Sequence, residues 1–128
     1  MKKLLSANSQ TDVLGFDVSE KHNVVGTSLQ GTIQTTYDKL VEIFGKPTYT
    51  DADPYEKVAC EWVMKVAMVD RPIFTNMKSD ILHTITIYSW KLGRIPTEQY
   101  DWHIGGKTGQ VVEIVESIIN NHKFEKRN

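Results

Sequence analysis

Two stretches of alternating apolar and polar residues limit the folds that this chain can adopt. In the first, VACEWVMKVAMV, Glu61 and Lys65 mark one face, and the other consists of Val58, Cys60, Trp62, Met64, Val66 and Met68. In the second, ILHTITIYSWK, one face holds Ile81, Ile85 and Ile87, and the other holds Leu82, Thr84, Thr86, Tyr88 and Trp90. A period of two residues predicts β-strands. The eleven residues between the strands favour an antiparallel hairpin.

Two other segments show helical spacing. In the first, Thr35 can cap a helix of about ten residues, and Gly45 can end it in a left-handed conformation. Its apolar face consists of Tyr37, Leu40, Val41 and Phe44. The second helix follows the glycines near residue 106, and its apolar face consists of Val111, Ile114, Val115 and Ile118.

The order of these segments predicts the fold class. A strand over residues 24–34 precedes the first helix, and a short strand over residues 99–104 precedes the second, so the order is β-α-β-β-β-α. We expect an α+β fold, an antiparallel sheet of about four strands with both helices packed on one face. Gly26 and Gly31 inside the first strand indicate a bulge or a close approach of another backbone.

The 128 residues are enough for one domain but too few for two independent cores. We expect an N-terminal arm or short edge strand over residues 1–21, a single domain over 22–122 and a basic tail over 123–128.

Composition excludes several classes of function. The formal net charge is −1, so we expect no nucleic-acid partner and no binding to an anionic membrane. The single Cys60 lies on an apolar face, which indicates a packed, inert thiol and fits a cytoplasmic location. No segment reads as a signal peptide or a membrane span. The four histidines are scattered, and no catalytic pattern is present, so we expect no metal, no cofactor and no catalytic residue.

The segment DWHIGGKTG is the first candidate site. It fails the pattern of a nucleotide-hydrolysing P-loop, because Asp101 stands where the first glycine is required. A weaker interpretation is an anion site at a helix N-terminus, with an aromatic residue stacking a base. The alternative is an ordinary tight turn from strand to helix. The candidate ligand-binding residues are Trp102, His103, Gly105, Gly106, Lys107 and Thr108.

The second candidate site is the face of the second long strand that carries Thr84, Thr86, Tyr88 and Trp90. Flat aromatic rings beside small hydroxyls are typical of a stacking platform or of an interface hot spot. The alternative is partial burial of these residues under the N-terminal arm. If this face is uncovered, covering it favours a homo-oligomer.

Two resemblances add to these interpretations. TTYDKLVEIFGKPTYTD followed by CEWVMK resembles the helix, turn and strand of small lipoprotein-type modules that bind proteins. The wider set GTSLQG, LVEIFGKPT, EWVMK, TITIYSWK and WHIGGK resembles a group of small uncharacterised proteins of tailed phages. This second resemblance implies an accessory protein in infected bacterial cytoplasm, which blocks a host factor such as a defence-system component or sequesters a signalling nucleotide. It assigns no catalytic residue, and we expect a binding protein and not an enzyme.

Overall fold

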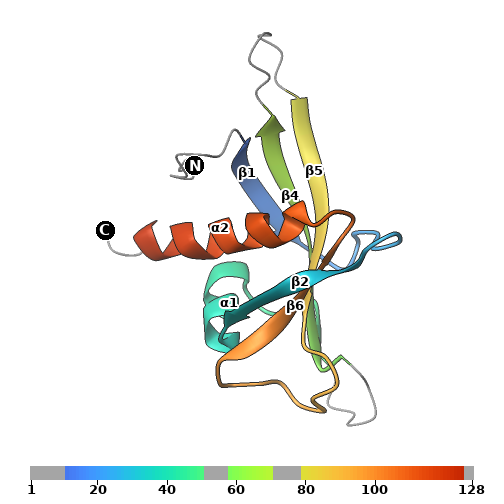
Figure 1. The fold of residues 1–128 in the computed structure, drawn as a ribbon, viewed down its shortest axis with the longest axis vertical. Helices are drawn as coiled ribbons and strands as arrows, with labels where there is room; N and C mark the ends of the chain where they lie inside the picture. The colour runs from blue at the N-terminus through green and yellow to red at the C-terminus, as the bar shows by residue number, and fades with distance from the viewer. Residues whose placement is uncertain (1–10, 51–57, 71–78, 126–128) are drawn as a thin grey trace.

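The computed structural model describes residues 11–50, 58–70 and 79–125, and Figure 1 shows their arrangement. These residues form one antiparallel sheet of six strands with two helices, which confirms the predicted α+β class. The elements in chain order are β1 (Thr11–Val18), β2 (Ser28–Thr35), α1 (Tyr37–Phe44), β3 (Tyr49–Thr50), β4 (Cys60–Asp70), β5 (Ser79–Tyr88), β6 (Tyr100–Gly106) and α2 (Gln110–Glu125).

The sheet is built around the predicted hairpin. β4 and β5 pair antiparallel, with Trp62 opposite Ile87 and Met64 opposite Ile85. The strand order is β1-β4-β5-β6-β2, and the two-residue β3 pairs with the start of β4. The sheet therefore has two strands more than the sequence predicts, because β1 extends one edge and β3 lies in a connection that reads as a turn.

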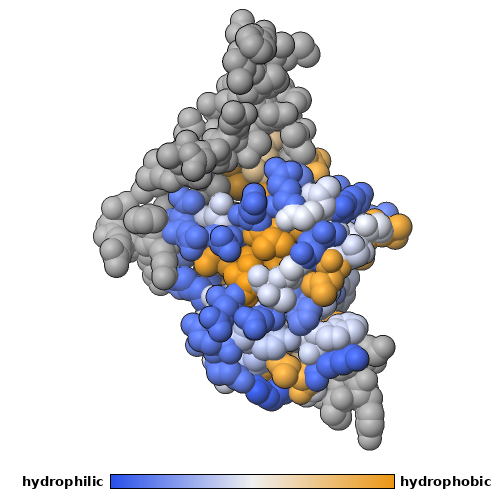
Figure 2. Space-filling model, in the orientation of Figure 1, coloured by the Kyte–Doolittle hydropathy of each residue, from blue (hydrophilic) through white to orange (hydrophobic). Residues whose placement is uncertain are grey.

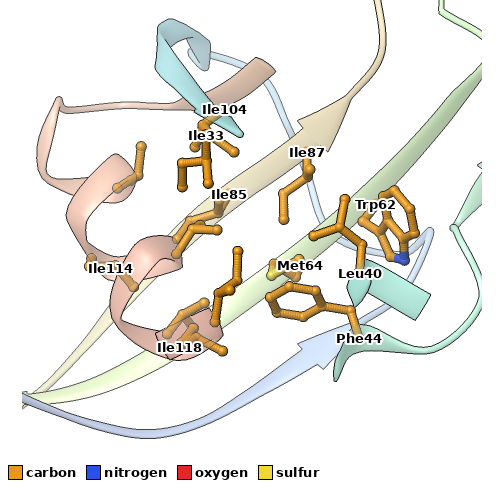
Figure 3. Close-up of a cluster of buried hydrophobic side chains, with 14 of the residues drawn as sticks. Ile33, Leu40, Phe44, Trp62, Met64, Ile85, Ile87, Ile104, Ile114 and Ile118 are labelled. Atoms are coloured by element: carbon orange, nitrogen blue, oxygen red, sulfur yellow. The ribbon is translucent and has the colours of Figure 1, made fainter. Parts of the chain in front are cut away.

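Both helices cover the same face of the sheet, as predicted, and the core lies between them and the strands (Figure 3). Trp62, Met64, Ile85 and Ile87 contribute fully buried side chains from the hairpin. The other face of the sheet, which we call the helix-free face, carries the side chains that alternate with these, such as Glu61 of β4 and Thr86 and Tyr88 of β5. This division follows from the alternation of the two long strands.

Cys60 and Trp62 of β4 are both buried in this core. The indole Nε1 of Trp62 donates a hydrogen bond of 2.9 Å to the carbonyl of Gly45, which joins β4 to the end of α1. Burial raises the pKa of the Cys60 thiol to about 11, so this thiol is a packed and unreactive group, as the sequence indicates.

The start of α1 differs from the prediction by one residue. Thr36, and not Thr35, is the N-cap, and its side chain accepts a hydrogen bond from the N–H of Lys39. Thr35 is instead the last residue of β2, paired with Tyr100 and buried. The helix is eight residues long and ends at Gly45, which has the predicted positive φ of 82°.

Two glycines allow α2 to approach the sheet closely. A Cβ atom on Gly31 of β2 would lie 2.9 Å from Val112, and one on Gly106 of β6 would lie 2.6 Å from Val111. The register of β2 also shifts between Leu29 and Gly31, so the predicted bulge occurs. The close approach at Gly31 is made by the side chain of Val112 and not by another backbone. α2 continues to Glu125, and the predicted tail is therefore helical over residues 123–125, while residues 126–128 lie outside the described part.

We expect Gly106→Ala to lower the free energy of unfolding by about 1–3 kcal/mol, because the added methyl group overpacks the contact with Val111. Gly109→Ala is the matched control, since only Gln30 lies near its Cβ position, at 4.0 Å. Gly109 directly precedes α2, and alanine is a poorer N-cap than glycine, which lowers stability by roughly 0.5 kcal/mol. Alanine also makes the unfolded chain less flexible, which raises stability by about the same amount. Urea unfolding of both variants measures the difference, and equal stabilities would contradict the packing argument.

Candidate binding site

The connection between β1 and β2, residues 19–27, lies against the helix-free face. β1 and β2 are consecutive in the chain but occupy opposite edges of the sheet. In Figure 1 the connection lies on the side of the β4–β5 hairpin opposite to the two helices. Val24 and Thr27 line the same cavity as Thr86 and Tyr88 of β5. The chain therefore covers part of this face with its own connection.

Hydrogen bonds give this connection a defined shape. The N–H of Thr27 donates to the carbonyl of Val24 at 3.1 Å and closes a tight turn. Gly26 occupies the third position of the turn with a φ of 88°, a conformation that strains other residues. At the start of the connection, the N–H of Ser19 donates to the carbonyl of Val63 at 3.0 Å. The connection is thus anchored to β4 before it reaches the turn.

A cavity of about 220 Å³ opens between the connection and the sheet. Gly105 of β6 is buried next to it, close to Thr86, Tyr88 and Ser28. Because glycine has no side chain, this position leaves space where another residue would fill it. The cavity is lined by Val24, Thr27, Ser28, Val58, Glu61, Thr86, Tyr88, Trp90 and Gly105.

Among the described residues that line the cavity, Glu61 is the one with a carboxyl group. It lies on β4 directly opposite Tyr88 of β5 and opposite Tyr49 of β3. Burial raises the pKa of the Glu61 carboxyl. Burial, and then the negative charge of Glu61, also raise the pKa of the Tyr88 hydroxyl. In the part of the chain that the structure describes, no hydrogen bond or ion pair compensates this carboxylate.

An aromatic cluster forms one side of the cavity. The rings of Tyr88 and His103 stack at 5.4 Å between centroids, and Tyr88 and Trp90 meet edge to face at 6.3 Å. The hydroxyl of Tyr100 accepts a hydrogen bond of 3.0 Å from the N–H of Trp90. Burial lowers the pKa of His103, and its Nδ1 is buried with no partner among the described residues. The packing holds Trp90 at the mouth of the cavity.

The predicted partner-binding surface is only partly exposed. Trp90 is 39% exposed and Tyr88 is half-buried, so both remain accessible. Thr84 and Thr86 are buried, and the prediction that they belong to an open platform is wrong for these two residues. The alternative is partial burial under the N-terminal arm of residues 1–21. Among the described residues, Thr86 shares its cavity with Val24 and Thr27, which lie just after that arm.

The predicted ligand-binding residues do not come together in one place. Trp102 is fully buried on the helix side, and its Nε1 donates to the carbonyl of Thr35, so it is not available to stack a base. His103 faces the opposite side, next to Tyr88. Gly105 and Gly106 are buried residues of β6. Lys107 and Thr108 are exposed in the turn before α2.

The sequence analysis missed five residues that line this cavity, namely Val24, Thr27, Ser28, Val58 and Glu61. Val24 and Thr27 are local turn residues, and only the sheet topology brings them to the cavity. In the alternating pattern of its strand, Glu61 is predicted to lie on the solvent-exposed face. Its one signal in the sequence is that it is a single acidic residue in an apolar strand whose predicted hairpin partner carries Tyr88 and Trp90 on the same face.

Comparisons with known proteins add no assignment. No family model, curated protein or solved structure matches this chain. Among the described residues, no group of three or more histidine, cysteine or acidic side chains is placed to hold a metal ion. None of the helices in the described ranges has the length and apolar character needed to cross a membrane.

We expect Trp90 to account for most of the quenching of tryptophan fluorescence by iodide. Trp62 and Trp102 are fully buried, whereas Trp90 is 39% exposed. Trp90→Phe should therefore remove most of the quenching, and Trp62→Phe should remove little of it. Unchanged quenching in Trp90→Phe would show that another indole reaches solvent.

We expect Glu61→Gln to raise the free energy of unfolding at pH 7 and to have no such effect below about pH 4. The folded state binds the Glu61 proton more tightly than the unfolded chain does, because burial raises the pKa of this carboxyl. Stability is therefore highest below the unfolded pKa and falls as the pH rises through the folded pKa. Denaturant unfolding at both pH values measures the change.

The exposed Glu116 of α2 provides the control for this prediction, since Glu116→Gln removes the same charge from the surface. An effect of Glu61→Gln that is equal at both pH values would contradict burial as its cause.

Proposed function

We propose that this protein is a non-enzymatic binding protein that holds a protein partner on the helix-free face of its sheet. The observation that carries the proposal is a cavity of about 220 Å³ beside exposed apolar side chains. Pockets for small ligands usually have volumes of about 300–1,000 Å³. The smaller cavity fits one side chain of a partner better than a whole nucleotide.

The surface around the cavity supports a protein partner. Val24 and Trp90, which line the cavity, are 40% and 39% exposed, and the adjacent Val25 is 77% exposed. Leu29, at the start of β2, is also exposed. Hydrophobic atoms are visible at the tip of the β1–β2 connection in Figure 2, where it projects from the sheet. Apolar and aromatic residues around a concave centre are typical of interface hot spots.

The resemblance to tailed-phage accessory proteins extends this proposal to the kind of partner. We propose a bacterial host protein, such as a component of a defence system, whose activity is blocked when it binds in the cytoplasm of the infected cell. Sequestration of a phosphate-bearing ligand is the less favoured function. Lys107 and Thr108 are exposed and available to an anion, but Trp102 and the two glycines are buried in β6.

A homo-oligomer remains part of the proposal on a narrower basis. The buried Thr84 and Thr86 need no second copy to cover them. Among the residues of β5 and just after it whose burial the structure describes, the exposed apolar side chains are Leu82, at 60%, and Trp90. Sedimentation equilibrium of the purified protein tests this point, and a monomer at all concentrations would remove the homo-oligomer from the proposal.

The binding function is tested with wild-type protein and two variants as bait in a bacterial lysate. We expect Trp90→Ala to lose a bound protein that wild type retains, because the variant removes the main exposed aromatic ring at the cavity. Leu82→Ala is the matched control. It removes another exposed apolar side chain of the same face, roughly 20 Å from Tyr88 along β5. The captured protein is then identified and its affinity measured by calorimetry. Equal recovery by all three baits would contradict the proposal.

A further inference from the structure

We propose that the cavity binds the cationic end of a lysine or arginine side chain of the protein partner, with Glu61 as its counter-ion and Tyr88 and Trp90 as aromatic walls. This inference rests on the proposed function, because it names the group by which the partner is anchored. The observation that supports it is that one carboxylate and two aromatic rings line the same cavity.

The first step is the charge of Glu61. A half-buried carboxylate without a compensating partner is unfavourable in the free protein. In the described part of the chain it has no ion pair and no hydrogen bond, and the other residues that line the cavity carry no positive charge. A cation that enters the cavity replaces the lost solvation, whereas a phosphate is repelled. The site is therefore complementary to positive charge.

The second step is the aromatic surface beside this charge. Glu61 lies directly opposite Tyr88 across the β4–β5 pair, so their side chains leave the same face of the sheet about 4.5–5.5 Å apart at Cβ. Trp90 meets Tyr88 edge to face and lines the cavity as well. Ring faces of tyrosine and tryptophan attract ammonium and guanidinium groups. The protein itself places the Nζ of Lys91 5.8 Å from the centroid of the Trp90 ring.

The third step is the size and lining of the cavity. About 220 Å³ exceeds the roughly 150 Å³ of an engineered apolar cavity that holds benzene. Val24 and Val58 provide apolar wall, which suits the methylene stem of a lysine or arginine. Thr27 and Thr86 add hydroxyl oxygens that accept hydrogen bonds from such a cation. The lining thus matches a long side chain with a charged end.

The test uses N-acetyl-lysine methylamide and N-acetyl-arginine methylamide as probes in an NMR titration of the ¹⁵N-labelled full chain. N-acetyl-norleucine methylamide is the neutral control, since it keeps the apolar stem and lacks the charge. We expect saturable shifts of the Trp90 indole signal and of the amides of Glu61, Tyr88 and Gly105 with one or both cationic probes. The neutral probe should cause at least tenfold weaker shifts at equal concentration.

Glu61→Gln tests the counter-ion directly, and Glu116→Gln on α2 is its matched control. We expect the affinity for the cationic probe to fall about tenfold or more in Glu61→Gln, in a protein whose other NMR signals keep their wild-type positions. Glu116→Gln should bind as wild type does. Equal binding of neutral and cationic probes, unchanged affinity in Glu61→Gln, or binding of inorganic phosphate at the same signals would overturn the inference. So would concentration-dependent shifts of the same signals without a probe, because a second copy would then fill the cavity.

Failure of this inference is distinguishable from failure of the proposed function. A partner captured from lysate that is lost with Trp90→Ala but kept with Glu61→Gln would retain the binding function and remove the cation as its anchor. A partner kept by both variants would remove both. Loss of the partner with each variant, together with the probe results above, is the expected outcome.

Discussion

The arrangement of this protein depends on one topological constraint, which is that β1 and β2 are neighbours in the chain and lie at opposite edges of the same sheet. Because α1 and α2 fill the other face, the chain between these strands lies against the helix-free face. The turn at Gly26 then brings Val24 and Thr27 over Thr86 and Tyr88. The cavity beside Thr86 results from this one crossing.

Polar groups on the two faces of the sheet differ in how well they are satisfied by hydrogen bonds. On the helix side, Trp62 and Trp102 are fully buried, and each indole N–H donates to a backbone carbonyl. On the opposite face, Glu61 is half-buried without compensation and His103 has an orphaned ring nitrogen among the described residues. The two indole N–H groups of the helix side are thus satisfied by hydrogen bonds, whereas these two groups of the helix-free face are not, among the described residues.

The sequence predicts the parts of this fold that depend on local periodicity. The alternation in β4 and β5 identifies their buried faces, and the spacing from Tyr37 to Phe44 identifies α1. β1 is harder to recognise because its register shifts between Val13 and Gly15, and this shift breaks the period of two. β3 contains only two residues, which is too short for any period. Local patterns thus predict the layers but not all of the strands.

The site is less predictable, because its residues come from four separate segments of the chain. Thr84 and Thr86 read as exposed on account of their hydroxyls, yet β-branched side chains pack well on a pleated surface and the chain covers them. Trp102 and His103 are adjacent in sequence but face opposite sides of β6. Glu61 is recognised as a candidate site residue only in the folded chain, where it lines one cavity with Val24, Tyr88 and Gly105. No spacing rule relates residues that converge in this way.

The anchored connection has a consequence for how such a protein can evolve. Residues 19–27 join two edge strands, and none of them belongs to the core beneath the helices. Exchanging this short loop would reshape one wall of the cavity and leave the wall built by the sheet in place. Surface loops tolerate such exchanges better than the strands and helices that they connect, so this wall of the cavity can change in sequence while the sheet keeps its packing.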